Sequence, residues 1–365
     1  MNINVKRDEL LKSLQSIIGV VERKQTMPIL ANVLISVDNN TLSITATDLE
    51  VELISTFNAK SENTGSFTAP GRKLLDICRA LPAGGDISIS HNDKKIIVSS
   101  GKSKFNLATL PENEFPVIKN IEQDDNIKIK QKELKRIIDK THFSMAQQDV
   151  RYYLNGLLLE VDSGNIRAVA TDGHRLAIST TKQNQEHGAK KQVIVPRKGV
   201  IELQRLLDGE GDIQIDLGAN HIQVKLQDVC FTSKLIDGRF PEYGRVIPSD
   251  TSNQLIADKE NLKSALQRTA ILSNEKYRGI RLIIKQNELT IQAHNPEQEE
   301  AEESMEIKYH GNEIEIGFNV NYLIDALNSV ESENVVLSLV DNNSSCLITD
   351  PKEDQSKFVI MPMRL

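Results

Sequence analysis

Residues 165–176 read NIRAVATDGHRL, an alternating apolar and polar run that ends in a Thr-Asp-Gly corner. Alternation with a period of two predicts a half-buried strand. The same arrangement occurs at residues 41–49, TLSITATDL, and at residues 288–296, ELTIQAHNP. Three strands that end in a polar corner at the same phase indicate an internal repeat, with copies about 125 residues apart.

Apolar residues at helical spacing precede each of these strands, in residues 9–18, 133–138 and 261–266. A second set follows roughly 60 to 70 residues later, in residues 74–81, 200–207 and 323–330. Two of the second sets come after Pro70 and Pro196, and proline suits the start of a helix. Strand-like stretches follow each set. We therefore predict an α+β fold in which each repeat contains two helix-plus-strands units.

The repeat spacing predicts three domains, which a length of 365 residues accommodates. Residues 116–126 are polar and acidic, and residues 248–254 are rich in Ser, Asp, Thr and Asn. Both stretches have the composition of short linkers. We expect domain bounds of 1–120, 127–247 and 254–365.

Composition excludes several classes of protein. Lys plus Arg number 44 and Asp plus Glu number 51, so the net charge is −7 and bulk charge gives no reason to expect nucleic-acid binding. Cys78, Cys230 and Cys346 lie far apart, which argues against a disulfide framework or a thiolate zinc site and favours a reducing compartment. The N-terminus lacks the apolar core of a signal peptide, and no apolar run has the length of a membrane span. We expect a soluble, cytoplasmic protein.

No motif predicts a catalytic residue, a metal site or a cofactor. Residues 101–103, GKS, resemble the end of a phosphate-binding loop, but Ile96 stands where that motif needs glycine. Residues 171–175, TDGHR, place an acid, an imidazole and a guanidinium together, yet neighbouring side chains in a strand or turn point different ways. Because Asp172 matches Asp48 of the first repeat, a shared turn is the better explanation. The His residues are scattered without metal-ligand spacing.

Charge is distributed unevenly along the chain. Basic residues concentrate in or beside the predicted helices, at residues 23–24, 72–79, 130–140 and 197–198. Phosphate contacts need Lys and Arg without any base-reading motif, so this pattern is a weak signal for nucleic-acid binding. Solvated helix faces explain it equally well. The acidic run at residues 297–306 is either a solvated face or a surface for a basic partner.

Six motifs carry a resemblance across the whole chain. They are RYYLNG at residues 151–156, ATDGHRL at 170–176, VPRKG at 195–199, DGRFP at 237–241, NPEQE at 295–299 and MPMRL at 361–365. In this order and across three repeats, the sequence resembles the family of bacterial DNA polymerase III beta subunits, the replication sliding clamps.

The resemblance implies three DNA-clamp domains and a head-to-tail homodimer that closes a ring, with helices around the central hole and sheets outside. It implies a non-catalytic processivity factor that encircles double-stranded DNA without sequence specificity and needs no cofactor. Its implied partners are the DNA polymerase III alpha subunit, the delta subunit of the clamp loader, and other polymerases and repair proteins. These partners would bind through short segments containing Gln and Leu or Phe, whereas no membrane contact is implied.

The resemblance also implies three groups of site residues. The partner-peptide pocket maps onto Leu154, Thr171, Gly173, His174, Arg175, Leu176, Pro241, Arg245, Val246, Asn319, Tyr322, Ser345, Val359, Met361, Pro362, Met363 and Arg364. The DNA contacts map onto Lys24, Arg72, Gln148, Tyr152, Tyr153, Arg197 and Lys198. The dimer interface, which charge and apolar pattern also favour, maps onto Lys73, Ile77, Phe105, Leu107, Ile271, Leu272, Glu299, Glu300 and Glu303.

Two other functions remain open at the level of the sequence. A peptide-binding repeat scaffold that does not encircle DNA would share the pocket but not the basic helices, and it predicts an open monomer. A DNA-acting enzyme with a non-obvious active site is disfavoured because no nucleophile, metal set or nucleotide loop is found.

Overall fold

The computed structural model describes residues 1–22, 27–61, 64–92, 95–118, 125–162, 164–182, 190–249 and 252–364. The chain divides into two compact units. Unit 1 comprises Met1–Lys132 and Lys198–Leu235, and unit 2 comprises Glu133–Arg197 and Ile236–Leu365. Within these described ranges, each helix is too short or too polar to cross a membrane.

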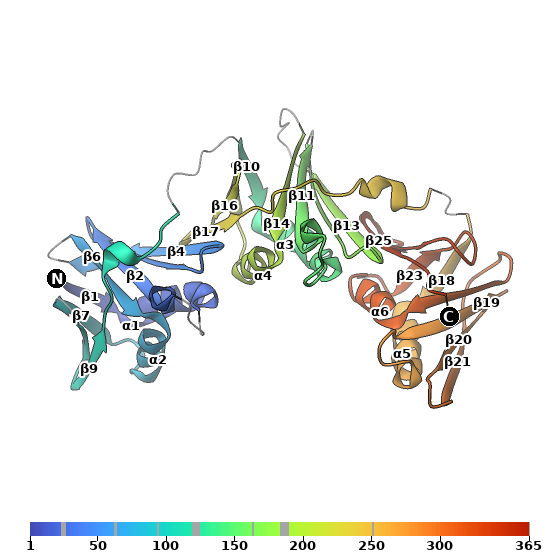
Figure 1. Ribbon diagram of the computed structural model, residues 1–365, viewed down its shortest axis with the longest axis horizontal. Helices are drawn as coiled ribbons and strands as arrows, with labels where there is room; N and C mark the ends of the chain where they lie inside the picture. Colours follow the sequence, from blue (N-terminus) through green and yellow to red (C-terminus); the bar gives the residue numbers. More distant parts are fainter. Residues whose placement is uncertain are drawn as a thin grey trace. The chain divides into compact units, whose positions relative to one another are not determined.

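One order of elements occurs three times, with the short strand β5 added in the first repeat, as Figure 1 helps to follow. The first repeat contains β1 (Asn2–Lys6), α1 (Arg7–Ile17), β2 (Asn32–Asp38), β3 (Thr41–Thr47), β4 (Val51–Asn58), β5 (Lys60–Ser61), β6 (Gly65–Pro70), α2 (Gly71–Ala80), β7 (Asp86–Asn92), β8 (Lys95–Ser100) and β9 (Ser103–Ala108). The second contains β10 (Asp125–Lys130), α3 (Gln131–Asp139), β11 (Gly156–Asp162), β12 (Asn165–Thr171), β13 (Arg175–Lys182), β14 (Lys191–Pro196), α4 (Arg197–Leu206), β15 (Asp212–Leu217), β16 (His221–Lys225) and β17 (Val229–Lys234). The third contains β18 (Gln254–Asp258), α5 (Lys259–Thr269), β19 (Gly279–Lys285), β20 (Glu288–His294), β21 (Glu300–Glu306), β22 (Ile314–Asn319), α6 (Val320–Asn328), β23 (Asn334–Ser338), β24 (Cys346–Asp350) and β25 (Glu353–Ile360).

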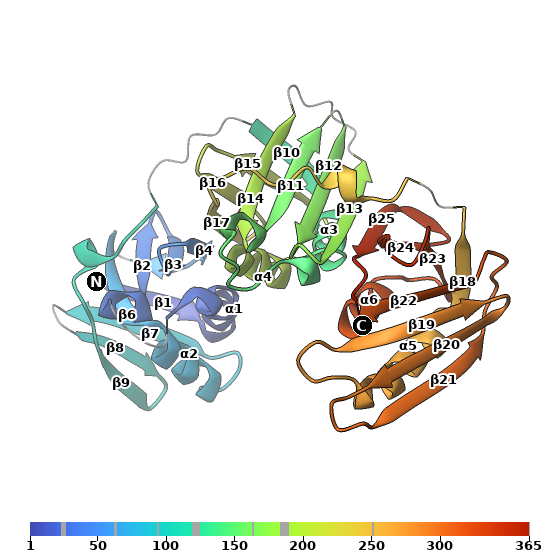
Figure 2. The same cartoon turned by 45° about the vertical axis from the view of Figure 1, so that its right-hand side comes forward.

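The helices bury the apolar stripes that the sequence predicts. In α1 the buried side chains include Leu10, Leu14 and Ile17, which recur at helical spacing. In the first and third repeats the two helices pack on each other, α1 on α2 and α5 on α6. In the third repeat, α5 also contacts β20 and β21, which Figure 2 shows lying across it. The predicted pair of helices in each repeat is therefore confirmed.

The polar corners after β3 and β12 are turns held by an aspartate. Oδ1 of Asp48 accepts hydrogen bonds from the backbone N–H groups of Glu50 and Val51, at 2.9 and 2.7 Å. Oδ1 of Asp172 does the same for His174 and Arg175, at 2.9 and 3.0 Å. An aspartate that bonds the backbone two and three residues ahead explains why the two motifs recur at one phase. The prediction of turn chemistry is confirmed.

Two long sheets join neighbouring repeats. The strand orders are β5-β1-β7-β8-β9, β10-β15-β16-β17-β4-β3-β2-β6, β14-β11-β12-β13-β25-β24-β23-β18 and β21-β20-β19-β22. In unit 1, β4 pairs antiparallel with β17. In unit 2, β13 pairs antiparallel with β25. The second repeat thus contributes four strands to an eight-stranded sheet in each unit, which is why the compact units do not coincide with the repeats.

Candidate functional site

A pocket of about 800 Å³ in unit 2 contains seven of the residues expected to bind partner peptides, and we call it the tail pocket. Its lining consists of Gly173, His174, Arg281, Glu315, Ile316, Gly317, Asn342, Asn343, Ser345, Met361, Pro362, Met363 and Arg364. The chain's last residues run between two elements, because Met361 N–H donates to the His174 carbonyl at 2.9 Å and Met363 N–H donates to the Gly317 carbonyl at 2.8 Å. The backbone therefore fixes the tail in place.

An apolar cluster in unit 2 contains two further predicted pocket residues, Leu176 and Val359. Leu176 and Val359 are cross-strand partners on β13 and β25, and both are almost fully buried. They belong to a cluster whose buried members are Leu158, Val169, Leu176, Ile178, Ile194, Phe240, Leu347 and Val359. Leu154 and Thr171 are also buried. These four predicted pocket residues are therefore buried side chains rather than an exposed lining.

Arg175 lies in a network internal to unit 2. Its guanidinium donates to Oδ2 of Asp172 at 3.1 Å, to Oδ2 of Asp325 at 2.5 Å and to the carbonyl of Phe143 at 2.7 Å. The Cζ atom lies 4.4 Å from the ring centroid of Tyr322. With 13% of the side chain exposed, Arg175 is a cross-link between the second and third repeats.

The remaining predicted pocket residues lie on two different elements. Asn319 caps α6 by accepting from the Asn321 N–H at 2.9 Å and donates to the Tyr277 carbonyl at 3.2 Å. Pro241, Arg245 and Val246 are exposed beside or within the 3₁₀ helix η6 (Tyr243–Val246).

A buried glutamate that the sequence did not indicate anchors η6. Glu160 on β11 is fully buried and accepts hydrogen bonds from Tyr243 Oη at 3.0 Å and Gln192 Nε2 at 2.6 Å. Lys190 and Arg167 are its ion-pair partners. Burial acts to raise the pKa of Glu160, but these donors outweigh it and lower the pKa. Tyr243 is thereby held against the apolar cluster, beside the exposed Arg245 and Val246.

The loop before η5 (Tyr152–Leu154) presents exposed side chains on a fixed backbone. Gln148 is exposed with a φ of 55°, and Val150 and Tyr152 are 95% and 59% exposed. Arg151 donates to both carboxylate oxygens of Asp149, at 3.0 and 2.8 Å, and lowers the pKa of Asp149 to about 2. The loop therefore keeps its ion pair throughout the neutral pH range.

Within the described residues, the other expected DNA contacts bond to groups of the protein or pack against its apolar cluster. Lys24 lies outside the described residues. Arg72 donates to the Val21 carbonyl at 2.9 Å and Arg197 to the Met145 carbonyl at 3.4 Å. Lys198 forms an ion pair with the buried carboxylate of Asp48. Burial opposes the charge of Lys198, yet the contact with Asp48 prevails and raises its pKa. Tyr153 is half-buried against the apolar cluster.

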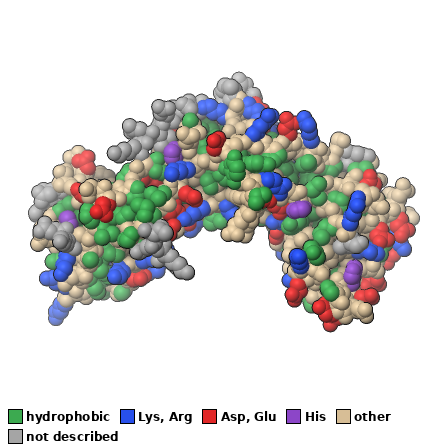
Figure 3. Space-filling model, viewed as in Figure 1, with side chains coloured by type: hydrophobic (Ala, Val, Ile, Leu, Met, Phe, Trp, Pro, Cys, Tyr) green, Lys and Arg blue, Asp and Glu red, His purple; other side chains and the backbone are tan. Residues whose placement is uncertain are grey.

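Four of the nine expected dimer residues lie on the end strands of two sheets in the described chain. Phe105 and Leu107 lie on β9, the last strand of its sheet, and both are half-buried. Glu300 and Glu303 lie on β21, which ends another sheet, and Glu303 bonds Arg268 at 2.8 Å. Other members differ in exposure, with Lys73, Glu299 and Ile271 exposed and Ile77 and Leu272 half-buried. In Figure 3, basic side chains gather around β9 in unit 1 and acidic ones around β20 and β21 in unit 2.

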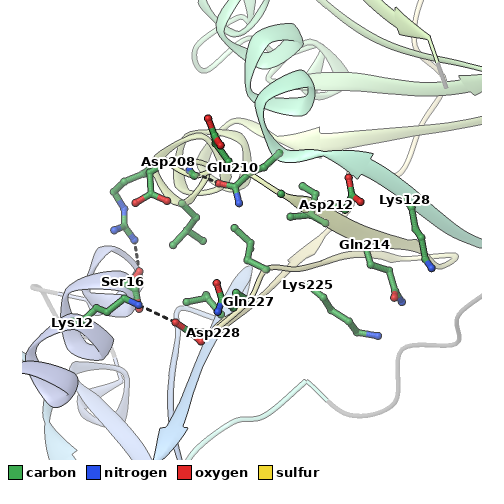
Figure 4. A pocket seen from close by; sticks show the side chains of 18 of the residues that line it. Lys12, Ser16, Lys128, Asp208, Glu210, Asp212, Gln214, Lys225, Gln227 and Asp228 are labelled. Atoms are coloured by element: carbon green, nitrogen blue, oxygen red, sulfur yellow. Dashed lines mark hydrogen bonds and ion pairs between the residues drawn. The ribbon is translucent and has the colours of Figure 1, made fainter. Parts of the chain in front are cut away.

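A second large pocket lies inside unit 1, with a volume of about 920 Å³. Figure 4 shows charges of both signs around it, including Lys12, Lys128 and Lys225 as well as Asp208 and Asp212. Arg205 of α4 donates to the Ser16 carbonyl at 2.6 Å, near the end of α1, and Lys12 pairs with Asp228 at 2.9 Å. These contacts join the first and second repeats through polar groups. In the described residues, no group of three or more His, Cys, Asp or Glu is placed to hold a metal.

Three copies of one two-helix, two-sheet unit, with sheets that continue from repeat to repeat, define the class of DNA-clamp proteins. Profiles of the DNA polymerase III beta subunit match residues 1–119 as its N-terminal domain, 128–242 as its central domain and 244–364 as its C-terminal domain. The chain belongs to the DNA polymerase III beta subunit family.

Individual relatives agree over the full length. The beta sliding clamp of Pseudomonas aeruginosa is 50% identical and that of Escherichia coli K12 is 47% identical, each with 100% of both chains covered. A crystal structure of DNA polymerase III subunit beta from Pseudomonas aeruginosa superposes with a TM-score of 0.98 at 49% identity, and Caulobacter crescentus pol III beta with 0.95 at 38%, again over 100% of both chains. The protein is thus a DNA sliding clamp and a non-catalytic processivity subunit, and the open-scaffold alternative is not favoured.

Proposed function

We propose that two copies of the chain close head to tail into a ring around duplex DNA, joined by β9 of one copy and β21 of the other. The observation that carries the proposal is the pairing between repeats. The third strand after a repeat's first helix pairs with the last strand of the next repeat, as β4 with β17 and β13 with β25. By position, β21 is the next such strand, and β9 is the last strand of the first repeat.

In the proposed ring, a second copy supplies a pairing partner for the open edge of each of these strands. Both strands end their sheets in the described chain, and an open edge is a template for another strand. Because β9 and β21 are different surfaces, the contact is heterologous, and it closes a ring when the rotation per copy permits. The acidic β21 and the basic Lys102 and Lys104 beside and within β9 provide complementary charge.

Charge reversal tests this interface. Replacing Glu299, Glu300 and Glu303 together by Lys is expected to weaken the dimer, measured as molar mass by light scattering over a dilution series. A control variant with Glu313→Lys and Glu315→Lys changes the same kind of charge near or on β22, at the other end of that sheet. An unchanged mass for the first variant at every dilution excludes the β9–β21 interface.

The tail pocket and the apolar cluster together suit short peptide segments. The tail pocket offers two methionines that adapt to different ligands and polar groups from His174 and Ser345, and the apolar cluster adds buried hydrophobic side chains. We infer that the polymerase III alpha subunit, the clamp loader delta subunit and other polymerases and repair proteins compete for it. Deleting residues 361–365 is expected to abolish peptide binding and to leave the dimer intact. Retained binding of a Gln-, Leu- and Phe-containing peptide contradicts this assignment.

DNA contacts in the proposed ring are made to the phosphate backbone and to exposed bases. Gln148, Tyr152 and Tyr153, with Lys24, Arg72, Arg197 and Lys198, remain the proposed set. Contacts of Lys and Arg with phosphates carry no sequence information, so the ring slides. Replication in bacteria takes place in the cytoplasm, which is the compartment that this function requires. The proposed domain bounds stay at 1–120, 127–247 and 254–365.

Retention on circular DNA tests encirclement directly. The protein is incubated with nicked circular DNA, a matching clamp loader and ATP, and then separated by gel filtration before and after the circle is linearised. Retention on circles with loss from linear DNA is expected for a ring. Equal retention on both forms contradicts encirclement, as does the absence of retention with a loader that loads another clamp.

A further inference from the structure

The tail pocket extends beyond the residues that the family resemblance assigns to it. Arg281 on β19, Glu315 on β22 and the amides of Asn342 and Asn343 line the same pocket as His174 and the tail. We propose that this extension binds an acidic flanking segment of the partner peptide, next to its apolar anchor residues. The inference rests on the proposed peptide function of the pocket.

The positive charges of the extension are accessible to a ligand. Arg281 pairs with Glu315 at 2.9 Å, with 38% and 56% of the two side chains exposed. Exposed ion pairs of this kind contribute little to folding, so a carboxylate of a ligand can replace Glu315 as the partner of Arg281. Arg364 is exposed on the same pocket. Two arginines against one glutamate favour an acidic ligand segment over a basic one.

The asparagines are presented by a fixed turn. Oδ1 of Asp341 accepts hydrogen bonds from the N–H groups of Asn343 and Ser344, each at 2.7 Å. Asn343 donates to the side-chain oxygen of Asn342 at 2.8 Å, and both side chains are exposed. Preorganised amides donate to and accept from an extended peptide backbone without a large ordering cost. The extension thus combines a charge preference with groups that bind any backbone.

The test compares three synthetic peptides with the same Gln, Leu and Phe residues. One has neutral flanks, one carries Asp-Glu before the anchors, and one carries Asp-Glu after them. Affinities for the full-length protein are measured by fluorescence anisotropy. One of the acidic peptides is expected to bind about three- to tenfold more tightly than the neutral peptide, a preference that added salt reduces.

Matched variants separate the extension from the rest of the site. Arg281→Ala is expected to remove the acidic preference and to leave the neutral peptide unaffected, whereas Glu315→Gln strengthens the acidic peptide about two- to fivefold. Lys285→Ala and Glu313→Gln are controls, because Lys285 and Glu313 form the other exposed pair near this edge, at 3.6 Å, and lie outside the pocket.

Each outcome has a defined meaning. Equal affinities of the three peptides for the unaltered protein overturn the inference and leave the peptide pocket standing. An equal loss for all peptides on Arg281→Ala also overturns it, because Arg281 would then support the pocket generally. Failure of every peptide to bind the unaltered protein refutes the proposed pocket itself.

Discussion

Replacing Arg175 should destabilise unit 2, because its guanidinium binds groups of the same unit. Hydrogen bonds to charged groups contribute about 1.5–3 kcal/mol each. The bond to Asp325 is discounted since 39% of that side chain is exposed, and Asp172 keeps its backbone donors when the arginine is lost. Only the bonds to Asp172 and to the Phe143 carbonyl are counted, so we expect Arg175→Ala to lower the free energy of unfolding by about 3 kcal/mol. Arg175→Lys keeps the charge but not the planar set of guanidinium N–H donors, so it should lower the free energy of unfolding by about half as much.

Thermal unfolding and hydrogen exchange measure this effect. For a unit of this size, about 3 kcal/mol corresponds to a fall in Tm of roughly 6–12 °C. Exchange should rise in β13 and β25, whose pairing begins at Arg175. Arg281→Ala is the control, because its exposed pair should cost no more than about 0.5 kcal/mol. If Arg175→Ala keeps its Tm and loses only peptide binding, the side chain acts on ligands and the reasoning fails.

Other predictions follow from buried groups elsewhere. Burial raises the pKa of the Cys78 thiol to about 12 and that of Cys346 further, so both should resist iodoacetamide in the folded protein, as mass spectrometry can show; rapid labelling would contradict their burial. Tyr243→Phe should cost about 1 kcal/mol and speed exchange in residues 241–247, while unchanged exchange would show that Glu160 does not hold this segment. Burial raises the pKa of Glu52, so its ionised form opposes folding increasingly as pH rises from the unfolded value through the folded one. Glu52→Gln can still accept from the Ile118 N–H and should raise the urea midpoint at neutral pH but not at pH 4; a lower midpoint at neutral pH would refute this.

The sequence predicted what depends on nearby residues. Helical stripes such as Leu10, Leu14 and Ile17 are set by spacing along one segment, and the structure buries them together. The turns at Asp48 and Asp172 follow from bonds that reach only two or three residues ahead. Because these signals are local and occur in each repeat, the repeated α+β architecture could be predicted from the sequence.

Contacts between segments that lie far apart in the chain could not be predicted from the sequence. Lys198 was expected to contact DNA, and its ion pair with Asp48 joins residues 150 positions apart. Arg175 and Asp325 are equally far apart in sequence. A charged side chain looks the same in sequence whether its partner is a phosphate or a carboxylate brought near by folding. Arg281 was missed for the same reason, since only the fold brings β19 beside the tail.

In the proposed ring, the strand pairing between copies must be protected against wrong partners in a way that the pairings within one chain need not be. Strands β4 and β17 belong to one chain, and this connection already favours their pairing over pairing with strands of other molecules. Strands β9 and β21 meet from solution, where an uncharged edge would also pair with copies of itself. The glutamates of β21 repel a second β21, and Lys102 and Lys104 disfavour a second β9, so opposite charge favours the head-to-tail contact over either symmetric one. Complementary charge at these two edges therefore selects the ring against both misassembled dimers.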